Sequence, residues 1–472
     1  MPGNQRFDAI VIGSGQAGGP LAADLARAGH KTALIERDHL GGSCINRGCT
    51  PTKTMVASAR VAWLARRATD YGVATGRVAV DMARVRKRKR DIVKRFGGVT
   101  PDRAPRVRGQ TVFFGEARFT GPHSVQVLLE HAAKGPRVRE LRADRIFVNT
   151  GARPARPAIE GLDEVDALDS TSIQELDRVP EHLLILGGGT IGVEFGQMFR
   201  RFGSRVTIVQ RGDALLARED PDVAEAVAAI LREDGIDVLL GAEARRVARG
   251  RRGGARRIEL TVRETRGGRS RLRTLGGSHL LVATGRTLES DRLNLAAAGI
   301  ETGDRGQILV DDRLETSVPG VYAMGDVTGG PAFTHIAYDD YRILRTNLLE
   351  RGHATTKGRL VPYTVFMDPE LGRIGLSETE ARARRIRIRV EKLGMDSVAR
   401  ALERDEPRGF IKVIVDAKTD LILGCAVLGI EGGEIMSMVE IAMLGKVRSS
   451  VLREAIFAHP TIAEALNNVF RR

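Results

Sequence analysis

Two cysteines near the beginning of the chain have a spacing that suits reversible redox chemistry. Cys44 and Cys49 lie in the stretch GGSCINRGCTPTK, with four residues between them. A disulfide across so short a loop removes little chain entropy, so it would add little stability to a protein of 472 residues. Pro51 and the apolar-periodic residues after it predict a helix that begins just past Cys49, and a helix N-terminus lowers the pKa of a nearby thiol. We therefore expect a disulfide that is made and broken during function.

A glycine-rich turn before this pair has the pattern of a dinucleotide-binding unit. The apolar run Phe7 to Ile12 leads into GSGQAG, a helical pattern covers Leu21 to Ala28, and a second strand, Lys31 to Ile35, ends on Glu36. The glycines of the turn are Gly13, Gly15 and Gly18. In such a unit, backbone N–H groups at the helix start bind a pyrophosphate and the acid binds ribose hydroxyls.

The same pattern returns in the middle of the chain. A strand, His182 to Leu186, leads into GGGTIG, whose motif glycines are Gly187, Gly189 and Gly192. Glu36 lies 18 positions after the third glycine of the first copy, and Gln210 lies 18 positions after the third glycine of the second. This internal repeat predicts two dinucleotide sites in one chain.

The second copy ends on a different side chain, which bears on the choice of nucleotide. Gln210 stands where the first copy has Glu36, and Arg211 follows it. The exchange removes the charge that would repel a 2′-phosphate and adds a cation that can pair with it. We therefore expect NADPH, with NADH as the alternative. Arg211 could also be one more surface arginine.

These features resemble the class I FAD-dependent pyridine nucleotide-disulfide oxidoreductases, in which CxxxxCxPxK directly follows GG. Dihydrolipoamide dehydrogenase, glutathione reductase and mercuric reductase belong to that family. The resemblance covers essentially the whole chain and implies an α/β fold, with two Rossmann-like domains for FAD and NAD(P) and a C-terminal α+β dimerisation domain. The implied division is 1–154 for the first FAD part, 155–282 for NAD(P), 283–356 for the second FAD part, and 357–472 for dimerisation.

The resemblance also assigns roles to individual residues. It makes Cys49 the flavin-proximal thiolate and Cys44 the interchange thiol, and it places Lys53 and Glu194 near the flavin N5. In FAHPTIAEALNNVF, His459 and Glu464 match a signature in which the imidazole of one subunit of a homodimer acts on the cysteine pair of the other and the carboxylate orients it. The further residues expected to contact FAD or NAD(P) are Gly42, Ser43, Ala117, Thr150, Gly151, Gly285, Gly325 and Asp326. No resident metal site is predicted.

The remaining segments give a coarser prediction of structure. Trp63 to Val99 is interpreted as two helices, and Val107 to Leu141 as a small antiparallel sheet with turns at Gly121 and Gly135. The last domain is expected to contain a helix over Thr379 to Arg385, further helices through Phe470, and strands over Thr364 to Met367, Phe410 to Val415 and Leu421 to Leu428. Cys425, inside the apolar run LILGCAVLG, is expected to be a buried small hydrophobe.

Composition and charge narrow the class of protein. A hydrophobic content of 42% and a charged content of 28% are typical of a soluble globular protein, and no run reaches the roughly 18 apolar residues that span a bilayer. The run Phe7 to Ile12 lacks a basic leader and is interpreted as a strand rather than a signal peptide. Three cysteines without a secretory signal then favour the cytoplasm.

The net charge of +15 raises the question of a polyanionic partner. Arginines cluster at Arg84 to Arg90, Arg245 to Arg273 and Arg382 to Arg389. Aromatic residues make up only 4% of the chain and are not interleaved with these clusters, which argues against single-strand nucleic acid binding. We interpret the clusters as solvated faces, part of whose charge attracts anionic dinucleotides.

The sequence leaves the electron acceptor open. The chain ends NNVFRR without the C-terminal cysteine pair of mercuric reductases, and it has the His-Pro that those enzymes typically lack. CINRGCTPTKT, GDVTGGPAFTHIAYDDYRI and HPTIAEALNNVF resemble the flavin reductases of reactive-chlorine resistance. Candidate acceptors are a small disulfide, as in dihydrolipoamide dehydrogenase, a soft ion such as Hg²⁺ or Cu²⁺, or a quinone. A basic, non-catalytic flavin-containing binding protein is the alternative of another class.

Overall fold

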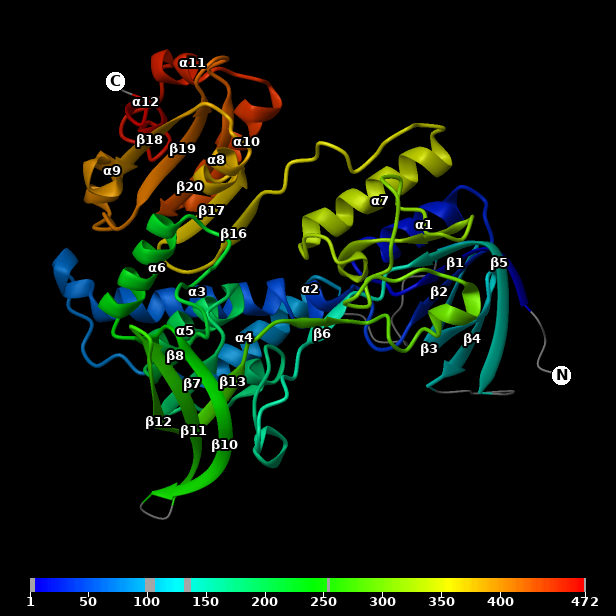
Figure 1. The fold of residues 1–472 in the computed structure, drawn as a ribbon, viewed down its shortest axis with the longest axis horizontal. Coiled ribbons are helices and arrows are strands. Elements are labelled where there is room, and N and C mark those ends of the chain that lie inside the picture. Colours follow the sequence, from blue (N-terminus) through cyan, green and yellow to red (C-terminus); the bar gives the residue numbers. More distant parts are fainter. Residues whose placement is uncertain (1–4, 98–106, 131–136, 253–254, 471–472) are drawn as a thin grey trace. The chain divides into compact units, whose positions relative to one another are not determined.

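The structure is a computed structural model that describes residues 5–97, 107–130, 137–252 and 255–470 (Figure 1). It contains two compact units, each made of three chain segments. Unit 1 comprises Met1–Thr54, Lys87–Pro154 and Arg286–Arg359, and unit 2 comprises Met55–Arg86, Ala155–Gly285 and Leu360–Arg472. The finer division into four parts stays a prediction.

Unit 1 is built on a six-stranded sheet in the order β1-β2-β3-β4-β5-β15, with β1 also paired to β5. The strands are β1 (Gln5–Ile12), β2 (Thr32–Glu36), β3 (Gln110–Gly121), β4 (Ser124–Leu129), β5 (Val138–Val148) and β15 (Val321–Ala323). β1 pairs in parallel with β2 and β5, and its last four residues are buried, as the near-continuous apolar run requires of a strand covered on both faces.

The predicted small antiparallel sheet is present, but it is continuous with this larger one. β3 pairs in parallel with β2 over its first half and antiparallel with β4 over its second half, and β5 joins β4 and β1 in the same way. Length explains the difference, because strands of 12 and 11 residues reach two sets of partners. The turn after Gly121 joins β3 to β4, whereas the turn expected at Gly135 lies outside the described residues.

Helices position the functional segments of unit 1. α1 (Gly18–Arg27) follows the first glycine turn, and α7 (Thr334–Leu349) packs in the same apolar cluster. α1 buries Leu21, Ala22, Leu25 and Ala26, a spacing that places one apolar stripe against the sheet. Two short β segments, β6 (Ala152–Pro154) and β14 (Arg286–Leu288), pair antiparallel.

The cysteine segment forms α2 (Gly42–Asn46), which the sequence does not predict, and the beginning of α3 (Cys49–Arg66), the helix expected just past Cys49. Beyond Trp63 the prediction of two helices is partly wrong. α3 ends three residues later, a 3₁₀ turn follows at Ala68–Tyr71, and α4 (Met82–Arg95) is the one further α-helix among the described residues up to 97. Gly72, with φ of 75°, ends the 3₁₀ turn in a left-handed conformation that a helix cannot continue.

Unit 2 contains a parallel sheet in the order β13-β7-β8-β9. Its strands are β7 (His182–Leu186), β8 (Arg205–Val209), β9 (Asp237–Leu239) and β13 (His279–Val282), and its helices are α5 (Thr190–Phe202) and α6 (Pro221–Glu233). β7, the second glycine turn, α5 and β8 repeat the arrangement of β1, the first glycine turn, α1 and β2, so the predicted internal repeat is confirmed.

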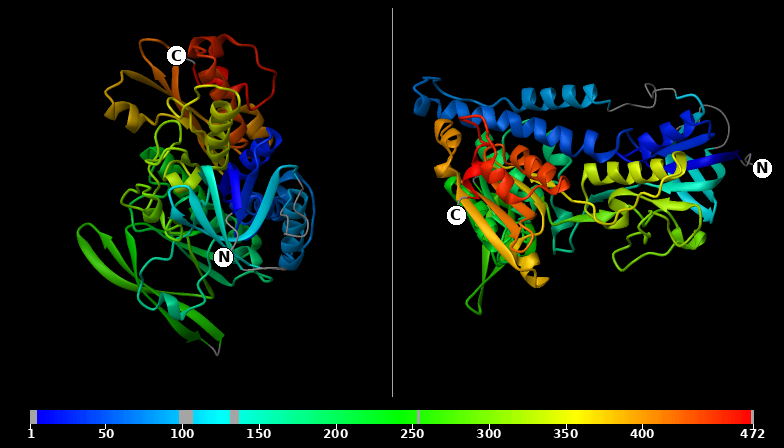
Figure 2. Two further views of the ribbon diagram at one scale, coloured as in Figure 1. Left: turned by 90° about the vertical axis from the view of Figure 1, so that its right-hand side faces the viewer. Right: turned by 90° about the horizontal axis from the view of Figure 1, so that it is seen from above.

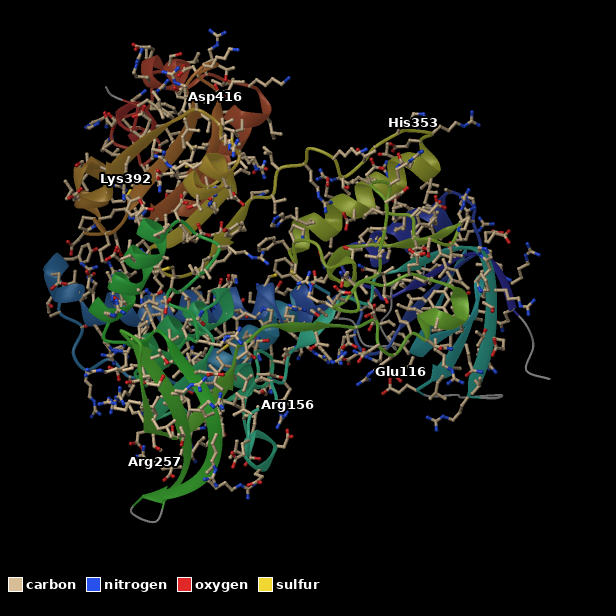
Figure 3. All side chains as sticks on the ribbon, in the orientation of Figure 1. Glu116, Arg156, Arg257, His353, Lys392 and Asp416 are labelled. Carbon is tan, nitrogen blue, oxygen red and sulfur yellow. The ribbon has the colours of Figure 1, made fainter. Side chains whose placement is uncertain are left out.

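A three-stranded antiparallel ribbon extends beyond this parallel sheet (Figures 1 and 2). It consists of β10 (Ala242–Arg252), β11 (Ala255–Arg266) and β12 (Arg269–Gly277), and it carries the second arginine cluster. Arg257, labelled in Figure 3, pairs with Glu181 at 2.6 Å, and Arg263 pairs with Glu243 at 2.5 Å. Several of the arginines therefore form ion pairs at the surface.

The last part of unit 2 is a five-stranded antiparallel sheet, β16-β17-β20-β19-β18. The strands are β16 (Tyr363–Val365), β17 (Glu370–Gly375), β18 (Ile388–Gly394), β19 (Phe410–Asp416) and β20 (Ile422–Gly429). The helices are α8 (Glu378–Ala383), α9 (Ala399–Glu403), α10 (Gly432–Leu444), α11 (Ser449–Glu454) and α12 (Ala465–Asn468). Two of these strands are not predicted from the sequence. β17 has two glycines in six residues, and the residues of β18 are only half-buried or exposed and show no apolar run.

The mixed α/β architecture with two dinucleotide-type units and an α+β part is thus confirmed. Within the ranges that the structure describes, no helix is both long enough and apolar enough to cross a bilayer.

Candidate functional site

The cysteine segment and the first glycine turn form one connected structure in unit 1. Cys44 lies in α2 and Cys49 is the first residue of α3. The Gln16 side chain donates a hydrogen bond from Nε2 to Gly41 O at 3.1 Å, and Gly41 N donates to Ser14 Oγ at 3.2 Å. The predicted redox pair is therefore fixed to the turn that is predicted to bind FAD.

The close approach of these two segments requires glycine. A Cβ on Gly42 would lie 2.7 Å from Gly15 Cα, which is closer than nonbonded carbons come. Gly42 also has φ of 68°, in the left-handed region. Ser43 follows it on α2 with an exposed side chain. The glycine pair before the first cysteine thus brings the redox loop against the dinucleotide turn.

The pKa values of the two thiols are shifted in opposite directions. Hydrogen bonding from Cys44 is the main cause that lowers the pKa of Cys49 to about 6, while burial opposes it and Thr334 and Lys53 assist. The same hydrogen bond, together with burial, raises the pKa of Cys44. At neutral pH the pair therefore favours a thiolate at Cys49 and a thiol at Cys44, which supports the predicted assignment of Cys49 as the flavin-proximal thiolate.

Thr334 is a residue of this site that the sequence analysis missed. Its Oγ1 lies 3.3 Å from Cys49 Sγ, and it is the first residue of α7. Two helices, α3 and α7, therefore begin at the Cys49 sulfur, and the partial positive charge of a helix N-terminus stabilises a thiolate. The two residues are 285 positions apart, so spacing along the chain gave no signal for this contact.

The glycines of the first turn lie in close contact with backbone atoms of the chain itself. A Cβ on Gly13 would lie 2.3 Å from Asn149 O, and a Cβ on Gly18 would lie 2.1 Å from Gly13 O. Glu36, at the end of β2, accepts hydrogen bonds from Ser14 N and Asp38 N, each at 2.9 Å, and from Ser14 Oγ at 2.6 Å. A carboxylate has about four acceptor positions, so one position of Glu36 remains for the predicted contact with a ribose hydroxyl.

An orphaned polar atom marks the same place. Thr150 Oγ1 is buried and has no hydrogen-bond partner among the described residues. Gly151, with φ of 73°, follows it, and Gly325 opens the loop that carries Asp326, whose carboxylate lies 3.5 Å from Arg286. The glycine cradle and the unsatisfied hydroxyl fit FAD, which offers polar groups to both. Ala117, the remaining predicted FAD contact, lies buried on β3 opposite Val127.

The second glycine turn, in unit 2, has the same close contacts. A Cβ on Gly187 would lie 2.3 Å from Ala283 O, and a Cβ on Gly192 would lie 2.0 Å from Gly187 O. Gly189 is the N-cap of α5, and Gly285, with φ of 136°, follows β13. This turn likewise presents backbone N–H groups at a helix start, the arrangement that binds a pyrophosphate.

The residues predicted to select the nucleotide directly follow β8. Gln210 Oε1 accepts a hydrogen bond from Gly188 N at 3.0 Å, and the Arg211 side chain is exposed. Gln210 is thus held by its backbone partner in the way that Glu36 is held in the first copy.

The predicted pair near the flavin N5 is divided between the units. Lys53 lies on α3 in unit 1, one turn after Cys49, where its charge helps to lower the pKa of that thiol. Glu194 lies buried on α5 in unit 2, and its Oε1 accepts a hydrogen bond from Phe366 N at 2.9 Å. Their pairing stays a prediction.

His459 and Glu464 are brought together near the end of the chain. The distance from His459 Nδ1 to Glu464 Oε2 is 2.9 Å, and the imidazole side chain is 68% exposed. Asn467 Nδ2 donates to Leu452 O at 2.8 Å and to Ala455 O at 2.7 Å, which ties α12 to the preceding segment. The carboxylate can therefore orient an imidazole whose other nitrogen faces outward.

Cys425 belongs neither to the Cys44–Cys49 pair nor to the His459–Glu464 pair. It lies on β20, completely buried, and burial raises its pKa to about 12. The prediction that it is a small buried hydrophobe is confirmed. Among the described residues, no group of three or more His, Cys, Asp or Glu side chains is arranged to hold a metal ion.

Comparison with protein families now decides the class. Residues 7–340 match the model of the pyridine nucleotide-disulphide oxidoreductase family, and residues 361–470 match the model of the dimerisation domain of the same family. The chain belongs to this family. Pyridine nucleotide-disulphide oxidoreductases are FAD-dependent enzymes that use NAD(P)H, so the expected enzyme class and the expected cofactors are confirmed.

Individual relatives of this oxidoreductase cover almost its whole length. The probable pyridine nucleotide-disulfide oxidoreductase RclA of Escherichia coli (strain K12) is 38% identical over 469 residues, 98% of this chain and 99% of that protein. A mercuric reductase of Bacillus cereus is 34% identical over 98% of this chain and 71% of that protein. A solved structure described as the Cu(II) complex of HOCl-induced flavoprotein disulfide reductase RclA from E. coli matches with a TM-score of 0.85 and 37% identity, covering 99% of each chain.

Proposed function

We propose that this oxidoreductase passes electrons from NADPH to the Cys44–Cys49 pair and from there to a soft metal ion. The main support for this proposal is the asymmetric thiol pair at the first glycine turn, in which the pKa of Cys49 is lowered to about 6. When bound, FAD accepts a hydride from the nicotinamide and supplies two electrons to a disulfide. All further steps belong to side chains of this chain.

The thiol pair performs a balanced two-electron exchange. Opening the disulfide takes up two electrons and one proton. The proton stays on Cys44, and Cys49 is left as the thiolate that Thr334, Lys53 and the start of α3 stabilise. Cys44 is then the thiol that meets the acceptor. Closing the disulfide returns two electrons, which reduce two Cu²⁺ ions to Cu⁺ or one Hg²⁺ ion to the metal, and it releases the one proton of Cys44.

A soft ion suits this pair because thiolates are the preferred ligands of copper and mercury. Similarity supports the same acceptor, since one relative is solved as a Cu(II) complex and others are mercuric reductases. The acceptor ion is a substrate in this proposal and needs no further protein ligands.

A small disulfide is the second candidate, and the His459–Glu464 pair favours it. A leaving thiolate needs a proton, and an imidazole held at 2.9 Å by a carboxylate can supply one. We infer that His459 acts on the cysteine pair of the partner subunit in a homodimer. The family dimerisation domain supports a dimer, as do the exposed apolar side chains Ile441, Leu444, Val451 and Ile456 of that domain.

The choice of NADPH and the cellular location are further parts of the proposal. The exposed Arg211 and the uncharged Gln210 favour a 2′-phosphate. A thiol pair that must be reduced in every cycle suits the reducing cytoplasm.

Anaerobic oxidation of NADPH with a panel of acceptors tests the function. We expect turnover with Cu²⁺ or Hg²⁺ and its loss in Cys44→Ser, because the interchange thiol is then absent. NADPH alone should produce a long-wavelength thiolate-to-flavin absorption band. An acceptor whose rate survives Cys44→Ser takes electrons from the flavin, and this outcome would contradict the proposal for that acceptor.

Replacing His459 separates the two candidates. His459→Gln is expected to lower disulfide reduction about 100-fold, the usual contribution of a general acid, while metal-ion reduction is unchanged. His353→Gln is the matched control, because that histidine is exposed and lies in unit 1 (Figure 3). If the disulfide rate is unaffected in His459→Gln, the imidazole has no role in proton transfer.

A further inference from the structure

Asn149 connects three segments of unit 1 through its side chain. It directly follows β5, and its side chain is buried. Its Nδ2 donates a hydrogen bond to Met324 O at 2.9 Å, and its Oδ1 accepts one from Gly18 N at 2.9 Å. Both ends of the amide are therefore used, one at the start of α1 and the other at the loop that leads to Asp326.

The contact with Gly18 replaces a local helix cap. Ala17, the N-cap residue of α1, has no side chain that can accept a hydrogen bond from the first turn. First-turn N–H groups have no acceptor within their own helix, so an outside acceptor stabilises the helix start. Asn149 supplies it from 131 residues away and thereby fixes the helix end at which the pyrophosphate is predicted to bind.

The amide also sets the spacing between the two segments. A Cβ on Gly15 would lie 2.8 Å from Asn149 Oδ1, and a Cβ on Gly325 would lie 2.9 Å from Asn149 Nδ2. Gly325 N donates in turn to Asp340 Oδ2 at 2.8 Å, so the loop is held from both sides. The glycine turn and the Asp326 loop are therefore locked at one distance from each other.

The second copy of the repeat has no such connection. Ala283 occupies the equivalent place, because its N–H donates to Leu186 O at 2.8 Å as Asn149 N–H donates to Ile12 O at 2.7 Å. A Cβ on the first glycine of each turn would lie 2.3 Å from the carbonyl oxygen of this residue in both copies. The backbone is thus the same, and only the first copy carries the bridging amide.

We propose that Asn149 is the positioning residue that makes the first site retain FAD, whereas the second site, with Ala283, exchanges its nucleotide. The proposal rests on the predicted FAD site. A cradle whose two walls are already fixed loses less conformational freedom when the cofactor binds, so the bound state is favoured. FAD must stay through many turnovers, but NAD(P)H must enter and leave in each one.

The test compares FAD affinity in Asn149→Ala with that of the unaltered protein, by reconstituting the apoprotein and following flavin fluorescence. Asn149→Ala leaves two buried backbone groups without partners, so we expect FAD to bind about 10- to 100-fold more weakly. Release of flavin on heating should begin at a lower temperature. Nucleotide binding at the second site should be unchanged. It is measured as the stabilisation of the apoprotein against unfolding by NADP⁺.

Asn347→Ala is the matched control. Asn347 also uses both ends of its amide in unit 1, donating to Ala354 O at 2.9 Å and accepting from Ala354 N at 2.7 Å, but it lies on α7 away from the glycine turn. It should lower stability without weakening FAD binding. Equal loss of FAD in both variants, or unchanged affinity in Asn149→Ala, would overturn the proposal.

Asn149→Asp provides a second variant in case Asn149→Ala does not fold. It keeps an acceptor for Gly18 N and removes the donor to Met324 O, so weaker FAD binding supports the bridge and unchanged binding refutes it. A measurement on the unaltered protein distinguishes a failure of this proposal from a failure of the predicted FAD site. If the unaltered protein binds no FAD at all, the predicted FAD site fails, whatever the variants do.

Discussion

The two glycine turns of this chain have nearly the same backbone, but different segments surround them. In both, the third glycine would place a Cβ 2.1 or 2.0 Å from the carbonyl oxygen of the first. In both, a residue at the end of the second strand or directly after it accepts a hydrogen bond from a backbone N–H of the turn, Glu36 from Ser14 and Gln210 from Gly188. The backbone arrangement that is predicted to bind a dinucleotide is therefore the same in both copies.

The additions to the first turn are what distinguish it. Gly41 and Gln16 attach the cysteine loop to it, and Asn149 attaches the loop before Gly325. The second turn has a methyl group at Ala283 and an exposed Arg211 beyond its last strand. One backbone motif can thus serve a retained cofactor or an exchanged one, depending on which segments are connected to it.

Disrupting one glycine turn at a time should give the largest effect, on the binding of FAD or of NADPH. Gly18→Ala forces a Cβ against Gly13 O, so we expect protein without bound flavin, measured as the ratio of absorbance at flavin and protein wavelengths. Gly192→Ala should keep its flavin but lose about 100-fold or more in kcat/KM for NADPH, since a shifted helix start no longer binds the phosphates.

Gly276→Ala is the control for both glycine variants, because a Cβ there meets nothing within 4 Å. It should retain both flavin and NADPH oxidation. If Gly192→Ala loses flavin while Gly18→Ala keeps it, the assignment of the two copies is reversed.

Exchanging the strand-ending residues should give a smaller effect. Gln210→Glu gives the second copy the carboxylate of the first and keeps the hydrogen bond from Gly188, so we expect the preference to move toward NADH. Arg211→Ala should lower kcat/KM for NADPH about 10-fold and leave NADH unchanged. Arg232→Ala, another exposed arginine of unit 2, is the control. Equal changes with both nucleotides would mean that Arg211 does not contact the 2′-phosphate.

Removing the Thr334 hydroxyl should give the smallest effect, at the thiol pair that only the first copy carries. Cys49 is a thiolate above its pKa, which is lowered to about 6, so the thiolate-to-flavin band should fade as pH falls through about 6. Thr334 lowers that pKa, so Thr334→Val should move the midpoint to higher pH, while Thr334→Ser restores it.

Thr346→Val is the control on the same helix, because its hydroxyl donates to Glu350 rather than to a cysteine. It should leave the midpoint where it is. A midpoint that is unchanged in Thr334→Val would show that α3, Lys53 and Cys44 suffice to stabilise the thiolate.

The parts of the site that sequence could predict are those that depend on short-range spacing. The turns at Gly13 and Gly187, the Cys44–Cys49 loop and the His459–Glu464 pair are each encoded within a few residues, where steric and electrostatic rules act directly. The repeat could be recognised because two such patterns occur at the same spacing.

The missed residues act across long separations. Thr334 reaches Cys49, and Asn149 reaches Gly18, only because strands and helices far apart in the chain pack together. No local pattern distinguishes either residue from an ordinary Thr or Asn. β18 was missed for a different reason, since its residues do not form the buried face that makes a strand visible in a sequence.

Because Cys425 is buried, chemical labelling of the native protein reports on Cys44 and Cys49 alone. With a pKa near 12 and no accessible surface, that sulfur stays silent toward alkylating reagents under native conditions. A mass measurement after mild labelling therefore separates the closed disulfide, which gains no group, from the open pair, which gains at least the group on the Cys49 thiolate, without mutagenesis. The same assay applied during turnover would time how long the pair stays open.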